Sequence, residues 1–181
     1  WREINMLMVS VVWRGRAIPL YWHLMENLGN SDYAEQTALL SQALPLLADY
    51  TVVVLGDREL CSVDLARWLG EQGHYFCLRQ KRCVYVKTSE HAAWQSMGTL
   101  GLSPGTQCFF STVTLTKSKG FGKAHLAGKW KRRYRGFAPE EPWFILTNFD
   151  ALDEAIRAYQ KRFDIEMRQP QYTHSHLSAA A

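Results

Sequence analysis

Two apolar-rich runs open the chain, and a tight turn separates them. Residues 4–13 are rich in Met, Val and Leu, and residues 17–25 follow after an Arg-Gly-Arg turn at 14–16. This spacing predicts two antiparallel strands joined as a hairpin. Pro19 lies within the second run and has no amide hydrogen to donate, so we expect that strand at a sheet edge or at a bulge.

The next fifty or so residues alternate between helical and strand patterns. Apolar positions recur at helical spacing over 33–47 and 63–71, and Pro45 is expected to shorten or kink the first of these helices. The short apolar runs at 51–55 and 74–78 predict strands. Strands that alternate with helices are joined by right-handed crossovers and run parallel, so the order predicts an α/β fold.

This rhythm breaks after residue 79. The following segment is rich in Gly, Thr, Lys and aromatic residues and carries short alternating runs, which predict an inserted, mostly β sub-domain. Residues 143–147 return to a buried-strand pattern, and a helix is predicted from 152 to at least 166. The predicted organisation is a main domain over 1–79, a β-rich basic insertion over 80–142, the main domain's last strand and helix over 143–169, and an irregular tail over 170–181.

Composition narrows the class of protein. Hydrophobic residues make up 47% of the 181 residues and charged residues 21%, as in ordinary globular domains. No run approaches the roughly 18 apolar residues that a membrane-spanning helix needs. The four cysteines form no Cys-x-x-Cys pair, so we expect reduced thiols of a cytoplasmic protein rather than a zinc site or a disulfide framework.

The net charge of +4 is unevenly distributed. No acidic residue lies between positions 117 and 135, and aromatic residues including Trp130 are interleaved with the cations. Such a segment predicts contact with backbone phosphates and unstacked bases, although a solvated loop whose aromatics face a core is the alternative. The eight cations are Lys117, Lys119, Lys123, Lys129, Lys131, Arg132, Arg133 and Arg135.

Two further features carry candidate chemistry. Asp57 follows the buried strand 51–55 directly after a glycine, at the rim where α/β proteins place their ligands, and its charge requires water, a cation or a metal there. Tyr159, Arg162 and Glu166 fall on one face of the last helix and would join a phosphate clamp to a carboxylate. The alternative for that face is a solvated Arg–Glu pair worth about 0.2–0.5 kcal/mol.

Four blocks, in order, resemble one family. They are Trp-Arg-Gly-Arg-Ala-Ile-Pro-Leu-Tyr-Trp at 13–22, Leu-Gly-Asp-Arg-Glu at 55–59, the strand at 143–148, and Tyr-Gln-Lys-Arg-Phe-Asp-Ile-Glu at 159–166. Together they are similar to bacterial insertion-sequence transposases of the DDE class, which carry a Tyr-x-x-Arg-x-x-x-Glu signature. The resemblance implies a ribonuclease-H-like α/β fold, a mixed sheet flanked by helices with an inserted, mostly β sub-domain.

The resemblance also implies roles for individual residues. Asp57 would be the second catalytic Asp and Glu166 the catalytic Glu, and both would be metal ligands. Tyr159 and Arg162 would contact DNA phosphate, and Arg58 would help to hold DNA or carboxylates. Family members cut DNA at transposon ends and join it to target DNA, using three carboxylates that hold two Mg²⁺ (or Mn²⁺) ions. Trp130 and Trp94 are candidates for an aromatic that stacks on DNA.

The resemblance further implies a dimer on DNA, without a membrane, in the nucleoid-associated cytoplasm of a bacterium. Three departures from the family pattern qualify these expectations. The first catalytic Asp would precede residue 1, Thr173 stands where a Lys is expected, and Pro170 would end the last helix soon after Glu166. We therefore expect an inactive catalytic-domain fragment. The alternatives are a non-catalytic DNA-binding remnant and a ribonuclease-H-like nuclease, which would need a third carboxylate.

Overall fold

The computed structural model describes residues 5–25, 29–135, 141–166 and 176–180. The helices are α1 (Tyr33–Ala43), α2 (Val63–Glu71) and α3 (Leu152–Glu166), with short 3-10 helices η1 (Leu44–Leu47) and η2 (Met97–Thr99). The strands are β1 (Met6–Trp13), β2 (Arg16–Leu24), β3 (Val53–Gly56), β4 (Tyr75–Arg79), β5 (Tyr85–Lys87), β6 (Gln95–Ser96), β7 (Gln107–Leu115), β8 (Phe121–Lys129), β9 (Trp143–Thr147) and β10 (His176–Ala180).

All of these strands join one sheet in the order β2-β1-β10-β3-β4-β9-β8-β7-β5-β6. β3 and β4, which α2 connects, pair in parallel as the sequence predicts. β1 and β10 are also parallel. The other neighbouring strands run antiparallel. In the described part of the chain the fold is thus mixed α/β, a mostly antiparallel sheet flanked by three helices, and the predicted α/β class is confirmed.

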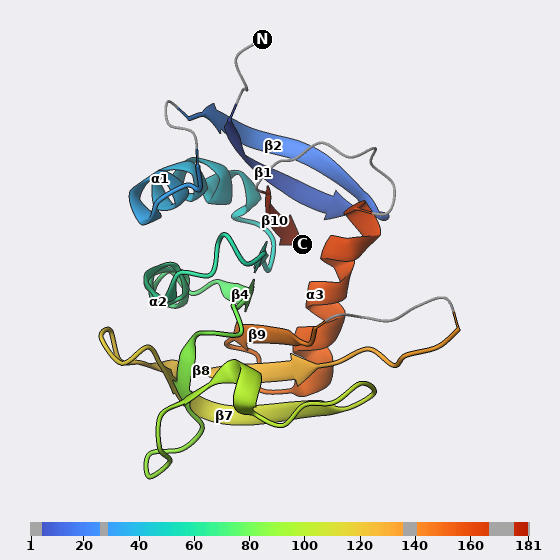
Figure 1. Cartoon of the computed structure of the whole chain (residues 1–181). Helices are drawn as coiled ribbons and strands as arrows, with labels where there is room; N and C mark the ends of the chain where they lie inside the picture. The colour runs from blue at the N-terminus through green and yellow to red at the C-terminus, as the bar shows by residue number, and fades with distance from the viewer. Residues whose placement is uncertain (1–4, 26–28, 136–140, 167–175, 181) are drawn as a thin grey trace.

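Helices cover both faces of the sheet, with α1 and α2 on one side and α3 on the other (Figure 1). The alternation of side chains along β3 explains this arrangement. Val54 packs into the cluster that holds the buried residues of α1 and α2, whereas Leu55 packs with Ala155, Ile156 and Tyr159 of α3. A strand buried on both faces is apolar at successive positions, which is the pattern that identified it in the sequence.

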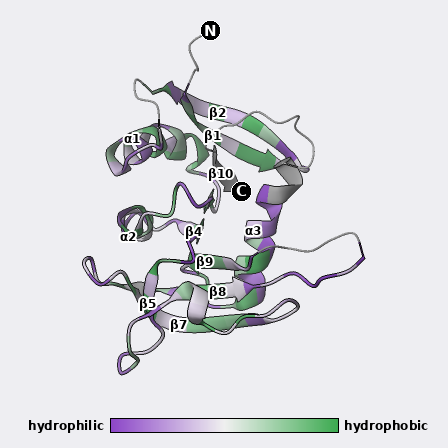
Figure 2. Ribbon diagram, in the orientation of Figure 1, coloured by the Kyte–Doolittle hydropathy of each residue, from purple (hydrophilic) through white to green (hydrophobic). Residues whose placement is uncertain are grey.

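The predicted hairpin is present as β1 and β2, and β2 lies at the edge of the sheet. The register shifts between Val9 and Ser10, where Ser10 pairs with Pro19. Both expectations for Pro19 are therefore confirmed, because it lies in an edge strand at an irregularity. Figure 2 shows hydrophobic residues along both strands, and Trp13, Ile18 and Trp22 remain exposed.

The first two helices begin where capping residues satisfy their free amides. Asp32 and Glu35 form a capping box at α1, and the Ser62 side chain accepts from the Asp64 amide at α2. The α-helical part of the predicted helix 33–47 ends at Ala43, and η1 continues it with Pro45 in its first turn. The expected effect of Pro45 is confirmed, since a proline lacks the amide that would continue the α-helical ladder.

The segment 80–142, predicted as an inserted sub-domain, is mostly β in its described part. Its strands extend the main sheet, because β8 pairs with β9 from Lys129↔Trp143 to His125↔Thr147. Its buried residues Val86, Val113 and Leu115 belong to the same core cluster as the side chains of α1 and α2. The insertion therefore shares the core of the main domain.

Part of the tail over 170–181, which the sequence predicted to be irregular, is a strand. Residues 176–180 form β10, which pairs in parallel with β1 and antiparallel with β3 (Figure 1). Strands in the middle of a sheet need partners for their backbone amides and carbonyls on both sides. Main-chain pairing of this kind requires no alternation of apolar side chains, so the pattern of the tail gave no sign of a strand.

Candidate functional site

Asp57 lies directly after β3, at the end of a tightly packed strand. A Cβ on Gly56 would lie 2.8 Å from Leu78 Cδ2 and 3.2 Å from Leu60 Cβ, so a larger residue would force these neighbours to shift. The Asp57 Oδ1 atom accepts a hydrogen bond of 3.0 Å from the Glu59 amide. This local bond turns the chain at the rim of the sheet and fixes the carboxylate.

Arg162 of α3 is a cation partner of Asp57, for which the sequence predicted water, a cation or a metal. Its Nη2 donates to Asp57 Oδ2 over 2.9 Å, and the Arg162 and Asp57 side chains are 8% and 21% exposed. The two residues are 105 positions apart in the sequence. Charge-assisted bonds of this kind are about twice as strong as neutral ones, and here the bond connects α3 to the end of β3.

The other two residues of the Tyr-x-x-Arg-x-x-x-Glu pattern have different placements. Tyr159 is fully buried and meets Trp143 of β9 edge to face, with ring centroids 5.5 Å apart. Tyr159 thus packs in the core between α3 and the sheet. Glu166 is the last residue of α3, but its side chain lies outside the described part of the structure. An approach of Glu166 to Asp57 remains a prediction.

The described side chains do not fit a two-metal site. Within them, no three His, Cys, Asp or Glu residues gather closely enough to hold a metal ion. Both Asp57 oxygens accept hydrogen bonds from protein donors. A two-ion site needs several carboxylates whose oxygens face the ions, and the described side chains do not supply this arrangement.

Glu141 was not identified from the sequence, yet it organises the cations beside Asp57. Its Oε1 accepts from Arg58 Nη1 over 2.6 Å and from Arg79 Nη2 over 2.8 Å. Arg58 follows β3, Arg79 ends the parallel neighbour β4, and Glu141 precedes β9. The only sequence signal for Glu141 is its place as an acid after the long basic segment, and spacing alone gives no sign of its partners.

The predicted DNA-binding cations lie on or beside β8. Lys117 and Lys119 occupy the β7–β8 turn, and both are exposed. Lys119 pairs with Asp64 of α2, and Lys117 Nζ lies over the Tyr85 ring at 4.2 Å from its centroid. Exposed residues beyond β8 are Arg132, Arg133 and Arg135, whereas Lys129, Trp130 and Lys131 are half-buried. The Lys123 side chain lies outside the described part of the structure.

Two of the candidate aromatics are less available than exposed stacking platforms would be. The half-buried Trp130 is held by backbone hydrogen bonds, since its amide donates to Thr106 O and its carbonyl accepts from Gly105 N. Trp94 is also half-buried, and Lys87 Nζ lies 5.7 Å from its ring centroid. A DNA contact through either ring remains a prediction.

The four cysteines, Cys61, Cys77, Cys83 and Cys108, are all free, as predicted. Burial raises the pKa of the Cys77 thiol to about 12, although its hydrogen bond with Thr147 acts in the opposite direction. Burial also raises the pKa of Cys61 and of Cys108. Thiols with raised pKa values stay protonated and react slowly.

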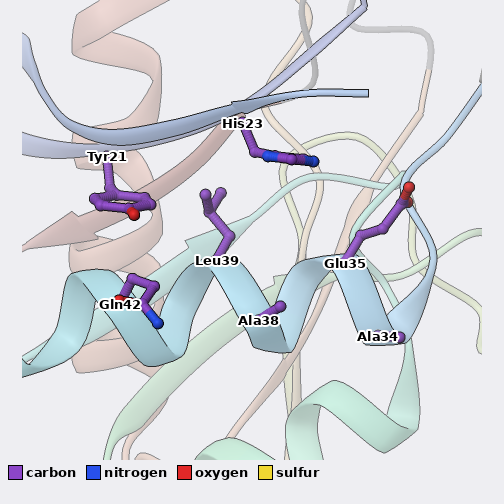
Figure 3. A pocket seen from close by; sticks show the side chains of 7 residues that line it. All are labelled: Tyr21, His23, Ala34, Glu35, Ala38, Leu39 and Gln42. Carbon is purple, nitrogen blue, oxygen red and sulfur yellow. The ribbon is translucent and has the colours of Figure 1, made fainter. Parts of the chain in front are cut away.

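A separate open pocket lies between β2 and α1 and involves none of the predicted site residues. It has a volume of about 600 Å³ and is lined by Tyr21, His23, Ala34, Glu35, Ala38, Leu39 and Gln42 (Figure 3). Glu35 is engaged in the capping box of α1. The pocket therefore has little charge that is available to a ligand.

Comparison with protein-family models and with curated proteins finds no match. In the described residues no helix is both long enough and apolar enough to cross a membrane.

Proposed function

We propose that this chain is part of the catalytic domain of a DDE-type DNA transposase, and that in the form described it binds DNA without cutting it. The observation that carries this proposal is the 2.9 Å contact between Arg162 and Asp57. It joins two blocks of the family resemblance, the strand-end Asp and the Tyr-x-x-Arg-x-x-x-Glu helix, at one edge of the sheet.

The order and direction of the elements support a ribonuclease-H-like arrangement. An antiparallel hairpin is followed by α1, then by two parallel strands joined through α2, and α3 packs on the opposite face. In sheets of this kind ligands bind beyond the carboxyl ends of the parallel strands. Asp57, Arg58 and Arg79 all lie at that end of β3 and β4.

The distribution of exposed cations supports DNA as the ligand. The β7–β8 turn and the segment after β8 present Lys117, Arg132, Arg133 and Arg135 to solvent. Cations that release counterions from phosphates provide most of the sequence-independent affinity for DNA. We propose that transposon-end and target DNA lie across this surface.

The state of Asp57 favours binding over cleavage. Arg162 neutralises the carboxylate, and the described side chains do not assemble the three-carboxylate group that DDE chemistry requires. In the intact family Mg²⁺ or Mn²⁺ supplies the activation of water and the stabilisation of the leaving oxygen. We therefore expect DNA binding that does not depend on these ions.

The test measures binding and cleavage in the same protein. Anisotropy of a labelled duplex should report salt-dependent binding that Arg162→Ala weakens, while Arg157→Ala, an exposed arginine on the same helix, serves as the control of equal charge change. Plasmid DNA incubated with Mg²⁺ or Mn²⁺ should stay supercoiled. Efficient nicking that Asp57→Ala abolishes would disprove the non-cleaving form. An absence of DNA binding at low salt would disprove the proposal as a whole.

A further inference from the structure

One carboxylate oxygen contacts two arginines at the carboxyl ends of β3 and β4. Glu141 Oε1 accepts from both Arg58 Nη1 and Arg79 Nη2, at 2.6 and 2.8 Å. The exposed fractions of these side chains are 50% for Arg58, 26% for Glu141 and 12% for Arg79. The group is therefore open to solvent on the Arg58 side and buried on the Arg79 side.

The same group lies beside the Asp57–Arg162 pair. β3 and β4 run parallel with Gly56 opposite Leu78, so the next residues along the two strands are Asp57 and Arg79. The side chains of Arg58, Arg79 and Arg162 and the carboxylates of Asp57 and Glu141 therefore lie near one another at this end of the strands.

Glu141 does not exhaust the donors of the two arginines. A guanidinium carries five N–H donors in a planar fork, and the fork matches the oxygens of a phosphate better than it matches one carboxylate oxygen. Arg79 Nε is buried and has no hydrogen-bond partner among the described residues. A buried donor of this kind is costly unless a ligand satisfies it in another state.

We infer that Arg58 and Arg79 form a clamp for one DNA backbone phosphate, and that Glu141 occupies this clamp when DNA is absent. This inference rests on the proposed function, because DNA is the ligand that would supply the phosphate. A phosphodiester shares one negative charge over two non-bridging oxygens, which can accept from both guanidinium groups and displace the single Glu141 oxygen. Glu141 thus holds the two cations in place before binding and competes with DNA for them.

The clamp adds a contact that the family pattern did not assign, because Arg79 lies outside the four resembling blocks. Removal of the competitor should strengthen DNA binding. Glu141→Gln keeps the size of the side chain but lowers its attraction for both arginines. If Glu141→Gln lets the phosphate contact form more completely, the plot of log K for DNA binding against log salt concentration should become steeper by up to about 0.9.

The experiment compares anisotropy titrations of a labelled duplex over a range of salt concentrations. Glu141→Gln should bind several-fold more tightly than the wild-type chain and with a steeper salt slope. Glu71→Gln, which changes the same charge at the exposed end of α2, is the control and should bind like the wild type. Arg58→Ala in the Glu141→Gln chain should remove the gain. Arg58 is half exposed, so that variant should fold, and a thermal melt verifies this.

The outcomes separate the clamp from the proposed function. Equal affinities and salt slopes for Glu141→Gln and Glu71→Gln, in chains that both bind DNA, would overturn the clamp and leave the proposed function standing. A gain in Glu141→Gln that survives Arg58→Ala and Arg79→Lys would also overturn the clamp, because the effect would then be general electrostatics. A loss of DNA binding in all chains, the wild type included, would overturn both.

Discussion

Arg162 carries its charge in a site that is almost closed to solvent, and it forms an ion pair with Asp57 over 2.9 Å. A charge in such a place is stable only while an opposite charge and hydrogen bonds compensate for its lost hydration. The pair therefore contributes to the attachment of α3 to the sheet as well as to the proposed DNA site. Substitutions at Asp57 and Arg162 can therefore separate the effect on the stability of the fold from the effect on DNA binding.

Asp57→Asn should destabilise the protein because it removes the negative charge that pairs with the nearly buried Arg162. The expected loss in the free energy of unfolding is about 1–3 kcal/mol, measured by urea denaturation. Arg162→Met in the same chain should restore part of this stability, since an apolar side chain needs no counterion, but it should weaken DNA binding as Arg162→Ala does. Equal urea midpoints for Asp57→Asn and the wild type would show that the pair has no structural role.

The raised pKa of the Cys77 thiol should make the protein less stable at alkaline pH. Its pKa is about 12 in the folded protein because of burial, compared with 9.0 for an ordinary thiol. Between these values the unfolded chain releases a proton that the folded chain keeps, so rising pH favours unfolding. The contribution of Cys77 to the free energy of unfolding is constant below pH 9 and should fall by about 1.4 kcal/mol per pH unit above it.

Cys77→Ser isolates this effect because a hydroxyl can keep the hydrogen bonds to Thr147 Oγ1 and Ala155 O and does not ionise in this range. Thermal or urea unfolding at pH 8, 9, 10 and 10.5 should show a steeper decline for the wild type than for Cys77→Ser. Other groups that titrate in alkali are common to both proteins and cancel in the difference. Parallel declines would contradict the raised pKa.

The sequence predicted those elements whose patterns are local. α2 has the predicted bounds, and β3 and β4 lie within about two residues of theirs, because buried strands and capped amphipathic helices leave a periodic signal. The sequence also predicted that Asp57 needs water, a cation or a metal, because an unpaired carboxylate at a strand end is costly, and Arg162 is such a cation. In these cases the chemistry of a few neighbouring residues sufficed.

What the sequence did not predict depends on contacts between distant segments. Glu141 meets Arg58 and Arg79 across 83 and 62 residues, and no spacing rule connects them. β10 forms through main-chain pairing with β1 and β3, which does not require an apolar pattern. The helical spacing of Tyr159 and Arg162 gave one common face, but Tyr159 is in the core because that face packs against Trp143.

Gly128 of β8 pairs with Cys108 of β7, and the space between them admits no further side-chain atom. A Cβ on Gly128 would lie 2.5 Å from Cys108 Sγ and 3.0 Å from Leu102 Cδ2. Gly128→Ala should therefore lower the free energy of unfolding by about 1–3 kcal/mol through overpacking. Cys108→Ala in the same chain should recover much of the loss, and additive effects of the two substitutions would contradict the predicted clash.

The two lysines of the β7–β8 turn should contribute unequally to DNA binding. Lys119 already pairs with Asp64, whereas the cation of Lys117 lies over the exposed ring of Tyr85. A phosphate must displace the carboxylate from Lys119 but can approach Lys117 directly, so Lys117→Ala should weaken binding more. It should also reduce the salt slope by up to about 0.9, the value for one phosphate contact.

Asp64→Asn tests the reason for this difference. It should release Lys119 and make Lys119→Ala as costly for binding as Lys117→Ala, measured by anisotropy at several salt concentrations. Asp64 also lies 3.6 Å from Arg67, so Arg67→Ala is included to separate the two cations. If Lys117→Ala and Lys119→Ala have equal effects in the presence of Asp64, the ion pair does not restrain Lys119, and the turn binds DNA through its total charge rather than through individual contacts.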